Sequence, residues 1–280
     1  MTTGRGLKFT FRQGGSTIET GGAYKILAAD GLSASGYETV GVESPFLPGE
    51  TVISQRALPR HVKAVMDCHP ENRDFVLRFF KPGHEGELTV RQNGVERRIA
   101  YLVDGFRIDA CNVHFDLMTF TARLRCPEPF FRSMSDFGYD IAAVTPLEIF
   151  PSAWEAGTRW FPDYRDFSTR VLVDNCGDVE IGLRLEVFAR GPAKNLFFAA
   201  GDGQRMDIFV DMEIGGRLVV NTVPRQKSVT LDGRNAIHRV GRDSAFIRLA
   251  PGENSLAYGA ETGLQRLAVK LFFTPLYLGV

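Results

Sequence analysis

The sequence lacks an excess of charge of either sign, a long apolar run and a signal-like start. Lysine and arginine together number 33, as do aspartate and glutamate, so the formal net charge is zero. Because binding to nucleic-acid phosphates needs a basic surface, this balance argues against nucleic acid as the main partner and leaves only a local basic patch open. No stretch approaches the roughly 18 apolar residues of a membrane span, so we expect no membrane partner. Residues 1–15 have no basic segment followed by an apolar one, so we expect no secretory signal.

Cysteine is scarce, and no two cysteines lie close together in the sequence. None of the four has the C-x-x-C spacing of a zinc or redox site. In the absence of a signal sequence, we expect four reduced and mostly buried thiols in a protein made in a reducing cytoplasm, although the even count leaves disulfides open. The cysteines are Cys68, Cys111, Cys126 and Cys176.

Patterns of reactive side chains are missing as well. The five histidines form no H-x-H, H-x-x-x-H or H-E-x-x-H pair, and no G-x-S-x-G turn or glycine-rich phosphate loop occurs. The aspartates that follow the turn at Gly201 lack the spacing of a calcium loop. Carboxylates on expected strands could pair for glycoside hydrolysis, but outward carboxylates usually keep a sheet face hydrated. We therefore expect no enzyme activity, catalytic residue, metal or cofactor. The carboxylates considered are Glu180, Glu186, Asp211 and Glu213.

What the sequence does contain favours β-structure in about two domains. Phenylalanine is frequent at 22 residues and glycine at 29, which suits strands joined by turns. Apolar and polar residues alternate over 181–188 and 206–214. Asn-Gly at 93–94 and Asp-Gly at 232–233 are strong hairpin signals. The length of 280 residues fits about two domains.

One helix is expected, over residues 70–83. Pro70 suits its start, a Lys-Pro-Gly at 81–83 suits its end, and apolar residues recur four positions apart between them. Other segments have the alternation or the β-forming composition of strands. The expected strands cover 7–12, 24–29, 37–42, 51–67 with a break at Pro59, 109–125, and a closing strand within 266–280.

The expected boundary between domains lies in residues 126–167, which contain five prolines and many aromatics but no sustained period. We expect an N-terminal β domain with one helix over 1–132, a linker over 133–167, and an antiparallel β-sandwich over 168–280. The fold class is thus mainly β.

Two segments have the composition of contact surfaces. The loop 42–52 places the apolar residues Pro45, Phe46 and Leu47 where loop tips are usually polar, which favours a partner surface. The aromatic residues between 154 and 167 allow two readings. They could stack on sugar rings, or they could anchor the linker or fill a subunit interface. The residues central to both readings are Trp154, Trp160 and Tyr164.

Several segments together resemble a known family. They are the helix-to-hairpin run DFVLRFFKPGHEGELTVRQNGVERRIAYLVDGF, the PEPFF at 127–131, and the closing series NTVPRQKSVTLDGRNAIHRV, FIRLAPGENSLAYGA and LFFTPLYLGV. In this order they resemble the phage distal tail proteins, the baseplate hubs of long non-contractile tails in phages and prophages of Gram-positive bacteria.

The resemblance implies an N-terminal domain that forms a hexameric ring around the tail channel and a galectin-like or jelly-roll sandwich outside it. It also implies a hairpin arm within 36–61 that embraces the neighbouring subunit, and no catalytic residues. The chain would join the tail tube protein to a tail-tip protein and to receptor-binding proteins, at the tip of a virion tail made in the bacterial cytoplasm. Two alternatives stay open: a carbohydrate-binding protein whose sandwich contacts host cell-wall glycan, and an enzyme acting on wall polysaccharide.

Overall fold

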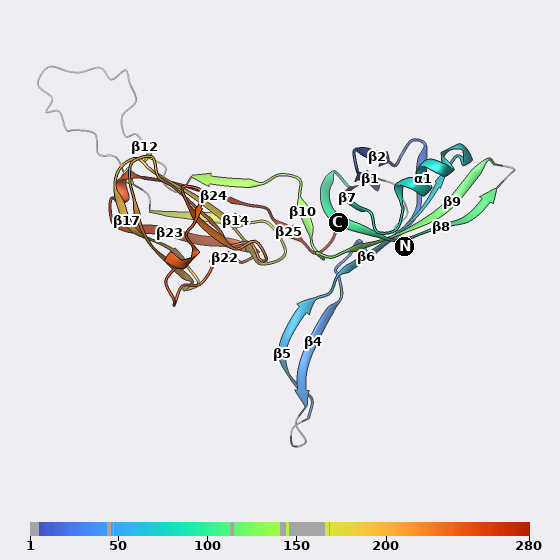
Figure 1. Ribbon diagram of the computed structural model, residues 1–280. Coiled ribbons are helices and arrows are strands. Elements are labelled where there is room, and N and C mark those ends of the chain that lie inside the picture. Colours follow the sequence, from blue (N-terminus) through green and yellow to red (C-terminus); the bar gives the residue numbers. More distant parts are fainter. Residues whose placement is uncertain are drawn as a thin grey trace, which may run out of the picture. The chain divides into compact units, whose positions relative to one another are not determined.

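The chain forms two compact units. The computed structural model describes residues 6–43, 46, 48–112, 115–140, 144–145, 166–167 and 169–280. The first unit comprises Met1–Met134 together with Leu276–Val280, and the second comprises Ser135–Pro275. Antiparallel strands make up most of both units, which confirms the mainly β fold class (Figure 1). No helix in the described ranges is long and apolar enough to span a membrane.

The first unit is built on one antiparallel sheet with the strand order β2-β1-β7-β8-β9-β6-β3. The separate strands β4 and β5 form a hairpin of their own between β3 and β6 in the chain. The strands of this unit are β1 (Lys8–Gln13), β2 (Ser16–Glu19), β3 (Tyr24–Asp30), β4 (Tyr37–Glu43), β5 (Glu50–Ala57), β6 (Arg60–Cys68), β7 (Glu85–Gln92), β8 (Val95–Asn112), β9 (Leu117–Cys126), β10 (Phe131–Ser133) and β25 (Leu276–Tyr277).

The expected helix is present but short. A 3-10 turn over Pro70–Asn72 leads into α1 (Arg73–Phe79), and Phe80 is the C-cap residue of this helix. Val76 and Phe79 of α1 are buried, and the Phe80 ring lies edge-on to Phe11 with ring centroids 5.3 Å apart. The apolar face of the helix therefore closes the core on one side of the sheet. This core is dominated by phenylalanine, and its largest fully buried side chains include Phe9, Phe11, Phe80, Tyr101 and Phe120.

The hairpin signals are confirmed by the backbone. Asn93 and Gly94, between β7 and β8, have φ values of 51° and 84°, which is the left-handed pair that a two-residue turn requires. Asp232 and Gly233 have φ values of 51° and 78° between β20 and β21. The single extended run expected over 109–125 is wrong, because β8 ends at Asn112 and the chain turns before β9.

The last residues of the chain return to the first unit. β25 pairs with β10, and the Arg97 guanidinium lies 3.6 Å from the centroid of the Tyr277 ring while donating to the carbonyl oxygen of Gly279. The expected end of the sandwich at residue 280 is therefore wrong, because these residues pair with strands of the first unit. The expected linker 133–167 also differs at its start, where β11 (Phe137–Asp140) pairs with β24 of the second unit.

A buried arginine fastens the C-terminal segment in place. Arg60, the first residue of β6, is 2% exposed, and its guanidinium carbon lies 4.7 Å from the centroid of the Phe131 ring. Its N–H groups donate to carbonyl oxygens from three separate parts of the first unit. These acceptors are Gly31, Ser33, Pro129 and Leu278. Burial lowers the pKa of Arg60, yet an arginine stays protonated, so one cation holds three chain segments together.

The second unit is an antiparallel sandwich. One sheet has the order β11-β24-β16-β19-β20-β21 and the other β14-β23-β17-β18, and each contributes alternate buried side chains such as Val187 and Ile208. Its further strands are β14 (Arg170–Asn175), β15 (Ile181–Gly182), β16 (Arg184–Ala189), β17 (Ala193–Ala200), β18 (Arg205–Met212), β19 (Arg217–Asn221), β20 (Ser228–Leu231), β21 (Arg234–Asn235), β22 (Arg248–Leu249), β23 (Gly252–Thr262) and β24 (Leu267–Phe273), with β12 (Val144–Thr145) and β13 (Asp166–Phe167) pairing separately and 3-10 turns over Ile237–Arg239 and Leu264–Arg266.

The alternation expected over 206–214 is correct as far as Met212 and wrong for Ile214. β18 ends at Met212, and Gly216 N donates to Glu213 O in the turn that follows. Ile214 therefore lies in a turn and is exposed.

Candidate functional site

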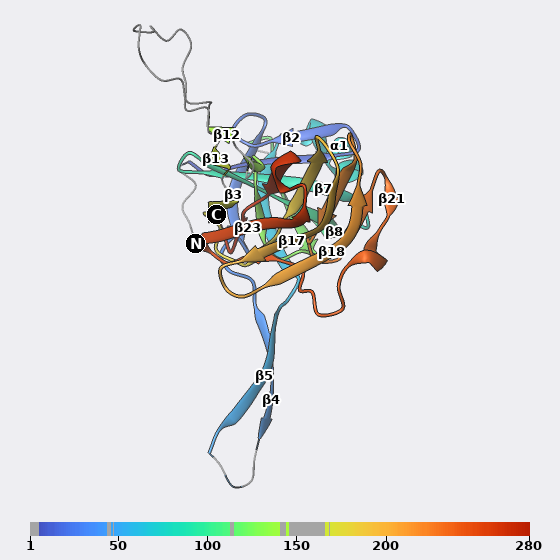
Figure 2. The ribbon, with the colours of Figure 1, turned by 90° about the vertical axis from the view of Figure 1, so that its left-hand side faces the viewer.

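The hairpin β4–β5 projects from the sheet of the first unit as an arm (Figures 1 and 2). Among the described residues its two strands pair only with each other, with a bulge between Val40 and Gly41. Leu58 N donates to Gly36 O at 2.8 Å, which closes the arm at its base. Residues 42–43 and 48–52 of the expected contact loop thus lie toward the far end of this arm.

The arm has almost no buried side chains of its own. Every residue of β5 before Ala57 is exposed, and apolar side chains occupy both faces of the hairpin. A two-stranded hairpin without a packed face is marginally stable in water, so such a surface is typical of one that a partner covers. The large apolar side chains about half exposed or more are Tyr37, Val40, Val42, Phe46, Val52 and Ile53.

The expected apolar tip is only partly described. Phe46 is 92% exposed, the highest value among the large apolar side chains of the described residues. Pro45 and Leu47 lie outside the described residues, as do Trp154, Trp160 and Tyr164 of the aromatic cluster. The contact roles of the tip and of the aromatic cluster therefore remain predictions from the sequence.

Charged side chains on the arm are arranged in two cross-strand pairs. Glu38 and Arg56 face each other and form an ion pair. Nearer the tip, Glu43 faces Glu50 in register, so two carboxylates lie side by side on one face. Opposite charges across a hairpin stabilise it and like charges destabilise it.

A row of basic side chains crosses the outer face of the sheet, opposite the core. Lys63 of β6 faces Arg123 of β9, and His61 faces Arg125, all four exposed and on adjacent strands. We call these four residues the basic row. Sequence reasoning missed it because the residues come from segments about 60 positions apart. The signal was present only as the i, i+2 spacing of basic residues within each strand.

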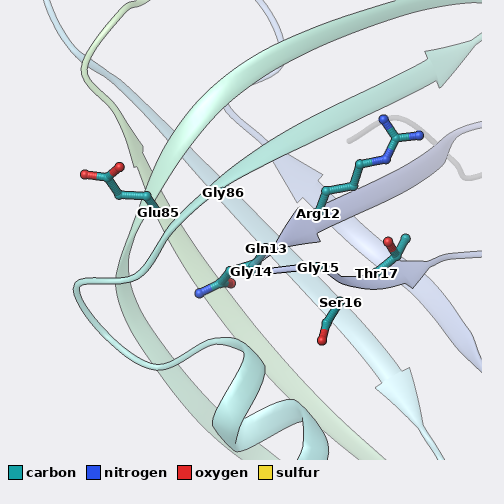
Figure 3. A pocket seen from close by; sticks show the side chains of 8 residues that line it. All are labelled: Arg12, Gln13, Gly14, Gly15, Ser16, Thr17, Glu85 and Gly86. Atoms are coloured by element: carbon teal, nitrogen blue, oxygen red, sulfur yellow. The ribbon is translucent and has the colours of Figure 1, made fainter.

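One hollow in the first unit lies beside the β1–β2 turn and has a volume of about 570 Å³. Figure 3 shows Arg12 and Glu85 pointing to opposite sides of it. The two amide atoms of Gln13 are buried there and have no hydrogen-bond partner in the part of the chain that the structure describes. Since the acid and the base diverge, this hollow presents no convergent reactive pair.

The second hollow lies in the sandwich, beside β18 and β20, and has a volume of about 550 Å³. Its lining combines the apolar side chains of Val210, Leu231 and Ala236 with amide, carboxylate, guanidinium and imidazole groups. The Asn235 side chain already makes one hydrogen bond, because its Oδ1 accepts from Ile237 N at 3.0 Å. Arg239 Nε lies 3.2 Å from His238 Nε2. We call this hollow the sandwich groove, and its polar lining residues are Asp211, Asp232, Arg234, Asn235, His238 and Arg239.

The carboxylates considered for glycoside hydrolysis are mostly held in ion pairs. Glu186 lies 2.8 Å from Arg217, and Glu180 lies 2.9 Å from Arg248. Asp211 is 4.0 Å from Lys194. Within the described ranges, no group of three histidine, cysteine or acidic residues could hold a metal ion.

The four cysteines are thiols without a disulfide, but the expectation that most are buried is wrong for two of them. Cys68 and Cys126 are buried, and Cys111 and Cys176 are exposed. Burial raises the pKa of Cys68 to about 11 and that of Cys126 to about 12. Thiols with such pKa values stay protonated at neutral pH and are poor nucleophiles.

Comparisons with known proteins agree with this architecture. A family model described as "Siphovirus-type tail component, C-terminal domain" matches residues 176–277. The fold of the chain is similar to the crystal structure of the Dit protein of phage SPP1, with a TM-score of 0.68 and 12% sequence identity over 96% of this chain and 98% of that one. That protein is described as a paradigm of the hub adsorption apparatus in phages that infect Gram-positive bacteria.

Two further structures show weaker likeness. They are of the phage p2 baseplate in its activated conformation, with Ca and with Sr, and they give TM-scores of 0.44 and 0.41. Their sequence identities are 8% and 9%, over 95% of this chain and 97% and 98% of theirs. Scores this low do not establish a shared fold. No curated protein matches the chain in sequence. Residues 176–277 thus match the siphovirus-type tail component family, and the fold of the chain is similar to that of SPP1 Dit across its length.

Proposed function

We propose that this chain is a structural hub subunit of a siphophage or prophage baseplate. Its copies assemble into a closed ring, hexameric as the family resemblance implies, which joins the tail tube protein to the tail-tip protein and the receptor-binding apparatus. The protein acts at the virion tail tip after synthesis in the host cytoplasm. The role is one of shape and contact and uses no catalytic residue.

The observation that carries this proposal is the uncovered arm. A ring of identical subunits needs a contact in which one surface of each copy meets a different surface of the next. The arm supplies such a surface, because Val42, Phe46 and Val52 expose apolar area that the subunit itself does not cover. Each large apolar side chain that becomes fully buried contributes about 1.5–3 kcal/mol, which is about tenfold or more in association.

The test is to remove that apolar area and measure assembly. The variant Val42→Thr/Phe46→Ser/Val52→Thr keeps residues that suit strands and a turn. We expect its thermal unfolding to match the wild type, while light scattering shows a shift from ring to monomer. A control variant, Phe115→Ser/Ile214→Ser, removes exposed apolar area elsewhere and should leave the ring intact. A ring that persists in the arm variant, at concentrations where the wild type assembles, would contradict the proposal.

A second candidate function is contact of the sandwich with host cell-wall glycan. The sandwich groove favours it, because a volume of about 550 Å³ lined by amide, carboxylate and guanidinium groups suits one or two hydroxyl-rich sugar units. Binding of wall polysaccharide by the whole protein, lost in Arg234→Ala/Asn235→Ala, would support this role. Loss only in Trp154→Ala/Trp160→Ala would assign the binding to the aromatic cluster instead.

A further inference from the structure

We propose that the basic row of one copy receives the paired carboxylates of the arm of a second copy. The pair is Glu43 and Glu50, and the row is His61, Lys63, Arg123 and Arg125. The proposal rests on the ring assembly proposed above and adds the surface on which each arm lands.

The arm carboxylates lie together on one face of the hairpin. Glu43 and Glu50 are directly opposed across the two strands, and both are exposed. The Glu50 side chain leans over Gly41, where a Cβ atom would lie 2.7 Å from its carboxylate oxygen. Neither carboxylate has an ion-pair partner within the described ranges. Two like charges in register destabilise the free hairpin, and a cationic partner would remove that cost.

The basic row has the complementary arrangement on a rigid support. Its four residues form two directly opposed pairs on β6 and β9, two neighbouring strands inside the sheet. The Arg123 guanidinium lies over Gly105 of β8, 3.0 Å from where a Cβ atom would stand. A side chain at position 105 would therefore displace it. The sheet presents the cations at fixed spacing, and the exposed Asp104 lies in the β8 bulge next to Arg123 and Arg125.

The carboxylate of Asp109, near the end of the row, already has hydrogen-bond partners within its own subunit. Asp109 accepts hydrogen bonds from the Thr121 hydroxyl and from Arg107, at 2.6 Å for Arg107. The Thr121 bond is the main cause that lowers the pKa of Asp109, followed by Arg107 and, more weakly, Lys63. On the other side, Asp30 of β3 lies opposite Lys63 and accepts a hydrogen bond from Gly31 N at 2.8 Å. No ion pair joins any of the four row residues to a carboxylate in the part of the chain that the structure describes.

The arm of the same copy cannot deliver its carboxylates to this row. Glu50 is seven positions before Ala57 along β5, and seven residues of strand span about 23 Å. The arm leads away from the sheet in both views (Figures 1 and 2). The row begins at His61, immediately beyond the base of the arm. A second copy must therefore supply the carboxylates, and repeating this head-to-tail contact closes a ring.

A second copy accounts for the row better than nucleic acid does. Binding to a phosphate backbone by electrostatics alone needs many cations, since each neutralised phosphate contributes a small part of the affinity. The row has four ionisable groups in a chain of zero net charge. The arm carries two unpaired anions at the spacing of one cross-strand pair, which is the spacing of each pair in the row.

The experiment uses zero-length carbodiimide cross-linking of the full chain, in an equal mixture of isotopically light and heavy copies. We expect an amide between Glu43 or Glu50 of one copy and Lys63 of the other, identified by its mixed mass. Glu43→Lys/Glu50→Lys, tested for assembly by light scattering, should weaken association by about tenfold or more. Lys63→Glu/Arg123→Glu should do the same, and combining both changes should restore the ring. The control Glu213→Lys/Glu253→Lys alters the net charge equally on the sandwich and should have no effect.

The possible results separate this proposal from the proposed function. If the apolar arm variant abolishes the ring but the charge reversals do not, the arm is an assembly contact and the basic row is not its receptor. If the wild type yields no mixed-mass cross-link at the highest soluble concentration, the proposal is wrong. If Lys63→Glu/Arg123→Glu abolishes a gel shift with double-stranded DNA and leaves assembly unchanged, the row is a nucleic-acid surface and the proposal is again wrong.

Discussion

Replacing Arg60 by alanine should destabilise the first unit and leave the second untouched. The change removes the one side chain that links the carbonyl groups of Gly31, Ser33, Pro129 and Leu278. Because Arg60 is 2% exposed, water cannot readily take over those acceptors without opening the structure. The perturbation thus tests whether one buried cation holds the C-terminal segment against the sheet.

The magnitude follows from two opposing contributions. Four hydrogen bonds from a charged donor, at about 1.5–3 kcal/mol each, would sum to roughly 6–12 kcal/mol. Burying the guanidinium costs several kcal/mol, which offsets a large part of that gain. We therefore expect a net loss of about 3–5 kcal/mol in the free energy of unfolding of the first unit, which lowers its Tm by about 10–20 °C.

Differential scanning calorimetry of the whole chain measures the two units separately if each unfolds in its own transition. Arg60→Lys should lose nearly as much as Arg60→Ala, because one ammonium group cannot reach four acceptors in three segments. Arg91→Ala, which removes an exposed arginine with one ion pair of 3.5 Å, should change the stability by about 0.5 kcal/mol or less. A Tm decrease below about 3 °C for Arg60→Ala would refute the reasoning. Full rescue by lysine would assign the effect to charge alone.

Four further predictions concern the same framework. Deleting residues 276–280 should lower the Tm of the first unit and leave the Tm of the sandwich unchanged, although these residues directly follow the sandwich in sequence. Calorimetry can check this. In native protein a thiol reagent should modify only the two exposed cysteines, and all four should react after denaturation without reductant; two or more missing thiols would reveal disulfides. Burial raises the pKa of Cys68 from 9.0 to about 11 and that of Cys126 to about 12 in the folded protein. The contribution of these two protonated thiols to the free energy of unfolding is therefore intact below pH 9 and is lost as the pH rises through the folded pKa values. Unfolding curves measured at increasing alkaline pH would show this loss. Gly31→Ala should cost more than Gly14→Ala in urea unfolding, since both have positive φ but only at Gly31 would a Cβ atom lie 1.9 Å from a carbonyl oxygen, that of His61; equal losses would contradict the steric argument.

Local patterns in the sequence were sufficient for the individual elements. Asn93-Gly94 and Asp232-Gly233 define their turns because few other pairs adopt two successive positive φ values. The alternation of β18 places Met206, Ile208, Val210 and Met212 on the core face because successive strand residues point to opposite sides. The ordered resemblance of whole segments led to the family, which neither composition nor spacing alone would have identified.

Tertiary structure decided which distant segments meet, since strand pairing depends on contacts that no local pattern encodes. The basic residues of 61–63 and 123–125 form one row only because β6 pairs with β9 in that register. The final residues belong to the first unit because Arg60, Arg97 and β10 hold them there, although they follow the last strand of the sandwich in sequence. Val42 and Val52, predicted to flank a contact loop, lie on an uncovered arm for the same reason. The strands β4 and β5 pair with each other and with nothing else among the described residues.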